Sequence, residues 1–179
     1  MRNINDLMEK AIDFHGHSCP GLAIGVLVSK YILDQGNSFS IDEELVAIVE
    51  NDNCSVDAIQ RLLGTTFGKG NLIFKDYGKN NYTFYNRTSE KAVNLRLKKD
   101  SKNQQAFSRE ERIDFIINSD PNDIFNIREI KFNPPQEDQI YDRIICENCQ
   151  DPTMSTRIKI YNGKKICIPC YLELEAKGK

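Results

Sequence analysis

The chain contains 179 residues, carries a net charge of −2 and has an ordinary hydrophobic fraction of 40%. This length accommodates one full domain and a small appendage, because domains commonly contain about 100–150 residues. The weak negative charge excludes a general electrostatic attraction to nucleic acid or anionic lipid, so neither a membrane nor a nucleic acid is expected as partner. The longest apolar run, residues 22–28, is far shorter than the roughly 20 residues that cross a bilayer.

The polar N-terminus lacks the apolar core of a signal peptide, which favours a cytoplasmic protein with reduced thiols. The six cysteines are therefore expected to be metal ligands or reactive groups rather than disulfides.

Apolar periodicity predicts helices in the first part of the chain. One helix is expected at residues 4–13, and a second at 21–33 with Pro20 in its first turn. Residues 45–49 are expected to form a buried strand, and residues 55–63 a helix that ends at Gly64.

The following segments predict mainly strands. Residues 72–77 and 82–87 alternate around a glycine turn and predict a β-hairpin, followed by a strand at 92–97. A capping box at residues 108–111 predicts a helix through Asn118, and residues 124–132 predict a last strand. The linker expected at 133–138 separates a mixed helix and antiparallel-sheet core domain, residues 1–135, from a small domain at 136–179. The predicted fold class is α+β.

Two CxxC pairs, Cys146/Cys149 and Cys167/Cys170, form the most specific motif in the chain. Two such pairs complete a tetrahedral shell of four thiolates, which predicts a structural Zn²⁺ ion. The residues between the pairs predict a hairpin with Asn162-Gly163 at its turn, and a helix follows Cys170, as in a treble-clef finger. A redox CxxC pair and a nucleic-acid-binding finger are the alternatives.

Residues 14–21, with the sequence FHGHSCPG, contain both histidines of the chain. In an extended loop, His15, His17 and Cys19 would project from the same face, which predicts a second metal site for zinc, nickel or iron. Cys54, next to another predicted helix start, is a candidate fourth ligand. Alternatively, the thiols are small buried hydrophobes and the imidazoles bond to backbone. His17 and Cys19 are also candidate catalytic groups, because a helix N-terminus favours a thiolate.

Residues 64–71 form a glycine-rich segment that contains Lys69, a third catalytic candidate. Its spacing does not match the nucleotide-binding P-loop, which excludes nucleotide hydrolysis. The segment either holds an anionic group on its amides and Lys69 or simply stops a helix and turns the chain. Three acidic residues near Cys54, namely Glu50, Asp52 and Asp57, are expected to orient ligands or to serve as caps.

These motifs together resemble the FmdE family, which takes its name from a component of formylmethanofuran dehydrogenase. The resemblance rests on residues 14–21, on residues 50–60 (ENDNCSVDAIQ), on residues 64–72 (GTTFGKGNL) and on the C-terminal cysteine pairs. It implies an α+β core, a homodimer and a metal-containing site at His15, His17, Cys19 and Cys54. Thr65 departs from the cysteine expected in many relatives, so chemistry that needs a thiol there is in doubt.

Three functions follow from these features. The first is an accessory or metal-handling factor for a molybdenum or tungsten oxidoreductase of the formylmethanofuran dehydrogenase type, which the resemblance implies as partner. The second is a stand-alone metal- or thiol-dependent enzyme that acts on a small anionic substrate. The third is a finger protein that binds nucleic acid or another protein.

Overall fold

The computed structural model describes residues 3–99, 107–134 and 141–177. The chain divides into two compact units, residues 1–138 and 139–179. The expected boundary between residues 135 and 136, and most of the expected linker, lie outside the described residues. Each unit is therefore considered by itself.

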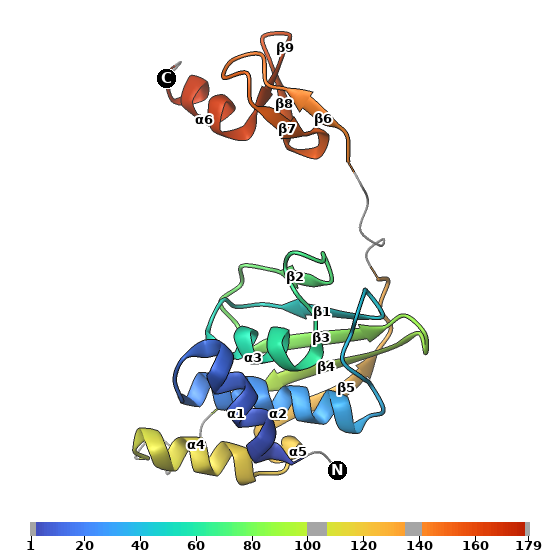
Figure 1. Cartoon of the computed structure of the whole chain (residues 1–179), viewed down its shortest axis with the longest axis vertical. Helices are drawn as coiled ribbons and strands as arrows, with labels where there is room; N and C mark the ends of the chain where they lie inside the picture. Colours follow the sequence, from blue (N-terminus) through green and yellow to red (C-terminus); the bar gives the residue numbers. More distant parts are fainter. Residues whose placement is uncertain (1–2, 100–106, 135–140, 178–179) are drawn as a thin grey trace. The chain divides into compact units, whose positions relative to one another are not determined.

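The first unit contains helices and strands in mixed order, coloured from blue to orange in Figure 1. They are α1 (Ile4–His15), α2 (Pro20–Asp34), β1 (Leu45–Val49), α3 (Cys54–Leu63), β2 (Leu72–Phe74), β3 (Asn81–Asn86), β4 (Lys91–Leu97), α4 (Arg109–Asn118), α5 (Pro121–Ile124) and β5 (Phe125–Ile130). The short helix α5 was not expected from the sequence. No helix among the described residues combines the length and the apolar character needed to cross a membrane.

Local capping explains where the helices begin and end. The Cys19 sulfur accepts a hydrogen bond from the backbone N–H of Leu22, and Pro20 occupies the first turn of α2. Asn53 caps α3 in the same way, and Gly64 ends that helix with a φ of 71°, a conformation that glycine adopts without strain. The predicted capping box between Ser108 and Glu111 is confirmed at the start of α4.

Within the described residues, five strands form one mixed sheet in the order β2-β1-β3-β4-β5. The predicted hairpin of residues 72–77 and 82–87 is wrong, because β1 lies between these segments: β2 pairs with β1 in parallel and β3 pairs with it antiparallel. The turn residues instead cross the end of β1, where Lys75 N–H donates to Val49 O at 2.9 Å and Lys79 N–H donates to Glu50 O at 2.8 Å. A buried strand needs hydrogen-bond partners on both edges, and this requirement overrides the local hairpin pattern.

One face of the sheet carries the main hydrophobic core. Alternate strand residues such as Ala47, Phe84 and Leu95 pack with α1, α2 and α3 in one buried cluster, and α4 packs on α2. Figure 1 shows these helices gathered on the same side of the sheet. The intervening residues, such as Val46 and Tyr85, form a smaller cluster on the opposite face. The odd-numbered apolar residues of β4, Val93, Leu95 and Leu97, face the main core.

The second unit consists of two short hairpins and a helix. Its elements are β6 (Arg143–Ile145), β7 (Pro152–Met154), the 3₁₀ helix η2 (Ser155–Arg157), β8 (Ile158–Tyr161), β9 (Lys164–Cys167) and α6 (Ile168–Lys177). Asn162 and Gly163 have positive φ angles of 47° and 79°, which confirms the predicted tight turn between β8 and β9. The hairpin of β6 and β7, which contains the first cysteine pair, was not expected.

Candidate metal centres

The four cysteines of the second unit converge from three local elements. Cys146 and Cys149 lie between β6 and β7, Cys167 ends β9, and Cys170 lies in the first turn of α6. Their sulfur atoms all lie within 4.8 Å of one another. Cys149 Sγ is 3.8 Å from Cys167 Sγ, and a tetrahedral shell with Zn–S bonds of about 2.3 Å also separates its sulfurs by about 3.8 Å. This donor set and geometry fit a structural zinc ion.

Backbone amides around Cys146 favour its thiolate, the form that binds a metal. The N–H of Cys167 donates to Cys146 Sγ at 3.2 Å. Hydrogen bonds from backbone N–H groups, first that of Cys149, lower the pKa of the Cys146 thiol to about 6.

The second cluster lies where α1 ends and α2 begins. His15 is the last residue of α1, Gly16 follows in the left-handed conformation with a φ of 92°, and Cys19 caps α2. The expectation of an extended chain from His15 to Cys19 is thus wrong, because His15 belongs to the helix and Gly16 reverses the chain. The turn nevertheless stacks the rings of His15 and His17 with centroids 4.4 Å apart. Ligand atoms of His15, His17 and Cys19 lie within 4.8 Å of one another.

A carboxylate from α3 orients His15. Asp57 Oδ2 lies 2.7 Å from His15 Nδ1, and the His15 side chain is only 12% exposed. The other ring nitrogen, Nε2, is buried and has no hydrogen-bond partner in the described part of the chain. A histidine that donates one ring N–H to a carboxylate and presents its other nitrogen as an acceptor is the usual arrangement of a metal-binding imidazole. The residues present therefore fit a metal ion at this loop.

Cys54 lies beside Cys19 but outside the cluster of ligand atoms within 4.8 Å that the described residues define. A Cβ atom on Gly21 would lie 3.8 Å from Cys54 Sγ and 4.0 Å from Cys19 Sγ, so the two sulfurs flank this glycine. Burial and then the hydrogen bond with Cys19 raise the pKa of the Cys54 thiol. The starts of α2 and α3 thus bring together the two cysteines that the finger does not use.

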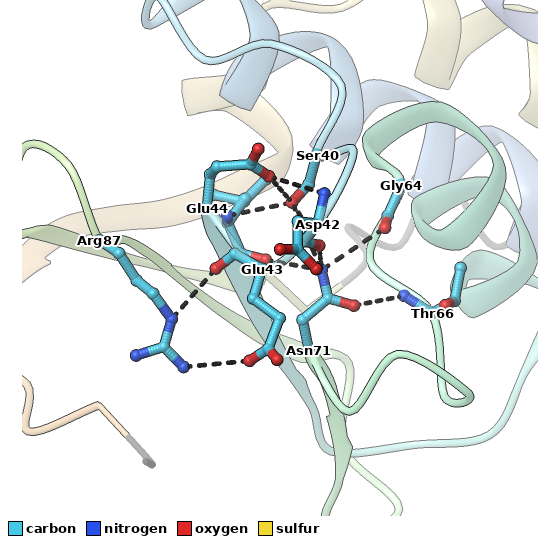
Figure 2. Close-up of polar contacts among 9 residues, drawn as sticks. Ser40, Asp42, Glu43, Glu44, Gly64, Thr66, Asn71 and Arg87 are labelled. Carbon is cyan, nitrogen blue, oxygen red and sulfur yellow. Dashed lines mark hydrogen bonds and ion pairs between the residues drawn. The ribbon is translucent and has the colours of Figure 1, made fainter. Parts of the chain in front are cut away.

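Polar contacts within the glycine-rich segment at residues 64–71 and with neighbouring segments hold it in place. The side-chain NH₂ of Asn71 donates to Ser40 Oγ and to the carbonyls of Asp42, Leu45 and Gly64, and its oxygen accepts from Thr66 N–H (Figure 2). The backbone amides of residues 67, 69 and 70 donate to partners within the same region. These contacts favour the interpretation as a helix stop and turn over that of an anion-binding loop.

The Lys69 side chain forms its contacts near the C-terminal end of α3, whereas Cys54 lies at the N-terminal end of that helix. Its ammonium group donates to the carbonyl oxygens of Ser40 at 2.7 Å and Ile41 at 3.2 Å, and it lies 5.8 Å from the centre of the Phe39 ring. Because α3 contains 10 residues, about 15 Å of helix separate its two ends. The structure does not bring Lys69 to the histidine and cysteine cluster.

Replacing Lys69 with methionine is expected to lower the free energy of unfolding by about 1.5–3 kcal/mol, because two carbonyl groups lose a charged donor. Metal content at the loop should stay at the wild-type level. Chemical denaturation together with elemental analysis checks both expectations. A variant of unchanged stability that loses metal would contradict the structural role.

Several other residues have local roles. Of the three acidic residues expected to orient ligands, only Asp57 contacts a ligand; Glu50 accepts from the side chain of Asn81, and Asp52 is exposed. Thr65, which replaces the cysteine expected in relatives, is fully buried.

The sequence did not reveal Arg109, whose guanidinium group donates to Ser18 O and fastens α4 to the loop. No sequence signal connects these two residues, which are 91 positions apart.

The fold and the two cysteine pairs define a metal-binding α+β protein with a C4-type zinc finger. Residues 14–126 match the model of the FmdE family, described as "Molybdenum formylmethanofuran dehydrogenase operon". The match covers more than half of the 179 residues, and the chain belongs to this family. Residues 139–176 match the prokaryotic dksA/traR C4-type zinc finger.

Two individual proteins are similar to the chain. A crystal structure of a tungsten formylmethanofuran dehydrogenase FmdE-like protein from Syntrophus aciditrophicus has a TM-score of 0.70 and 22% sequence identity, and the match covers 95% of this chain and 92% of that one. This likeness shows the fold. A "Probable S-adenosyl-L-methionine-binding protein" from Archaeoglobus fulgidus is 28% identical over 195 aligned positions, which cover 92% of this chain and 52% of the relative. The chain thus spans about half the length of this curated relative.

Proposed function

We propose that this FmdE-family protein holds a second transition metal, zinc, nickel or iron, at His15, His17 and Cys19, besides the structural zinc of its finger. In this proposal it acts in the cytoplasm, as a homodimer, as an accessory or metal-handling factor for a molybdenum or tungsten oxidoreductase. The observation that carries the proposal is the buried Nε2 of His15, which has no partner among the described residues while the other ring nitrogen is bonded to Asp57.

The donor set supports a site with exchangeable ligands. Two imidazoles and one thiolate suit zinc, nickel or iron, and three protein ligands leave a coordination position open. The sulfurs of Cys54 and Cys19 both flank Gly21, so movement of one side chain would close the site. A site that alternates between an open and a closed shell suits a protein that transfers a metal.

The proposed oxidoreductase partner is inferred from the comparisons with known proteins. The family description and the Syntrophus structure both refer to formylmethanofuran dehydrogenase, in one case with molybdenum and in the other with tungsten. The two descriptions apply to those proteins, and the association with such an enzyme is extended to this chain as part of the proposal.

A stand-alone enzyme is the second candidate function. The neighbouring thiols of Cys19 and Cys54 favour it, because Cys19 lies beside an imidazole that Asp57 orients and whose other ring nitrogen has no partner among the described residues. Such a group serves as a general base as readily as it serves as a metal ligand. The Archaeoglobus relative is named for binding S-adenosyl-L-methionine, which agrees with a small-molecule ligand.

Metal analysis tests the proposal. Wild-type protein is expected to bind two metal ions per chain, and His17→Ala one, because removal of a ligand leaves only the finger site. Asp57→Asn should retain the loop site but weaken its metal affinity by about 10–100-fold, since the carboxylate raises the basicity of His15. Elemental analysis and competition with a chelator provide the two measurements.

Asp52→Asn is the matched control, because it neutralises an exposed carboxylate near Cys54 that contacts no ligand. It should behave as wild type. One zinc per chain in both wild type and His17→Ala, with unchanged affinity, would refute the loop site while leaving the finger intact.

A further inference from the structure

A cavity of about 430 Å³ lies between α2, α4 and the end of β4. Its apolar walls include Ile24, Leu97, Phe107, Phe115 and Ile116. The rings of Phe107 and Phe115 meet edge to face with centroids 5.6 Å apart. A cavity of this size with aromatic walls accommodates a flat apolar group of a small molecule.

The rim of the cavity is positively charged. Among the described residues, Lys98, Lys99 and Arg112 line it, against one acidic lining residue, Asp123. Lys98 Nζ donates to Asn122 O at 2.5 Å, which fixes one of these cations at the rim. This arrangement attracts an anion and repels a cation.

A second cavity offers an internal comparison. It has a volume of about 390 Å³, and its charged lining residues are one cation, Lys91, and one anion, Glu129. Its lining therefore carries no net charge. The excess of cations distinguishes the cavity beside α4 from one of similar size on the same unit.

The cation-lined cavity is connected to Cys19 and Cys54 through residues next to them in the chain. Pro20, directly after Cys19, forms part of its lining. Asn80 also lines it and accepts a hydrogen bond at 2.8 Å from the side chain of Asn53, the residue before Cys54. A ligand in this cavity would therefore lie against the start of α2 and against Asn80, which is bonded to the residue before α3.

We propose that this cavity binds a small molecule with an aromatic or apolar body and an anionic group, the body between Ile24 and Phe115 and the anion beside Lys99. This inference deepens the second candidate function and rests on it only for the chemistry at Cys19 and Cys54. The cations that line this cavity supply the anion-binding groups that Lys69 does not provide, because Lys69 is bonded to two carbonyl oxygens.

A pair of fluorescent dyes tests the proposal on the full-length protein. The dye 1-anilinonaphthalene-8-sulfonate carries an aromatic body and a sulfonate, whereas N-phenyl-1-naphthylamine has the same body without charge. Wild type is expected to bind the sulfonate more tightly. Lys99→Glu should weaken sulfonate binding by about tenfold through charge reversal at short range and leave binding of the neutral dye unchanged. Ile24→Trp should weaken both dyes by filling the cavity.

Lys91→Glu in the second cavity is the matched control and should leave both affinities unchanged. Equal binding of the two dyes, or the same effect from Lys91→Glu as from Lys99→Glu, would overturn the proposal. Because Lys99 is exposed, its substitution tests the charge without affecting packing, even if Ile24→Trp disturbs folding. Dye binding by His17→Ala at the wild-type level would separate this cavity from the loop metal, so that failure of one proposal is not mistaken for failure of the other.

Discussion

Replacing Cys149 with serine is expected to unfold the C-terminal unit and leave the core unit folded. The hydrophobic cluster of the finger contains four buried residues among those described, Cys146, Ile166, Cys167 and Cys170, three of which are cysteines. So small a core leaves folding to the metal, and structural zinc sites contribute about 10–16 kcal/mol. Loss of one ligand removes most of this stabilisation.

Two-dimensional amide NMR measures this result, because signals from residues 141–177 should collapse toward random-coil shifts while those of the core stay dispersed. Zinc content should fall by one ion per chain, and a strong chelator should act on wild type in the same way. Ser155→Ala, a change at a partly exposed residue of the same unit that is not a zinc ligand, is the control and should retain both zinc and fold. A folded finger in the Cys149→Ser variant would show that packing alone suffices.

Replacing Gly25 with alanine is expected to destabilise the core more than any surface change. A Cβ atom at this position would lie 2.2 Å from Ser55 O and 2.7 Å from Ser55 Cα. Both are backbone atoms, so only separation of α2 and α3 relieves the overlap. Overpacking of this kind costs about 3 kcal/mol or more, which corresponds to a decrease in Tm of about 10 °C.

Gly68→Ala is the matched control, because a Cβ atom there has no atom within 4 Å among the contacts described. Thermal unfolding followed by circular dichroism should separate the two variants clearly. The same separation of helices would shift Cys19, at the start of α2, relative to Asp57 of α3, which orients His15, so Gly25→Ala should also weaken metal binding at the loop. Equal Tm values for the two variants would contradict the close approach of α2 and α3.

Local signals in the sequence predicted the elements that carry the ligands. Helix caps such as Pro20 and Gly64, the five-residue apolar run of β1 and the turn at Asn162-Gly163 all act through neighbours a few residues away. The two CxxC pairs belong to the same class, since each pair and the hairpin between them are short-range features. The histidine and cysteine spacing at residues 15–19 likewise marked a cluster whose ligand atoms the structure brings together.

The tertiary structure decided what depends on residues far apart in the chain. It inserted β1 between β2 and β3, because a buried strand needs partners on both edges, and it directed Lys69 to two carbonyl oxygens 28 and 29 positions away. It also bonded His15 to Asp57, 42 positions along the chain, and left Nε2 of His15 buried, with no partner in the part of the chain that the structure describes. The sequence by itself thus determined which residues supply the ligands. Packing of α1, α2 and α3 decided how those ligands are oriented, because orientation depends on hydrogen bonds between helices that no local pattern encodes.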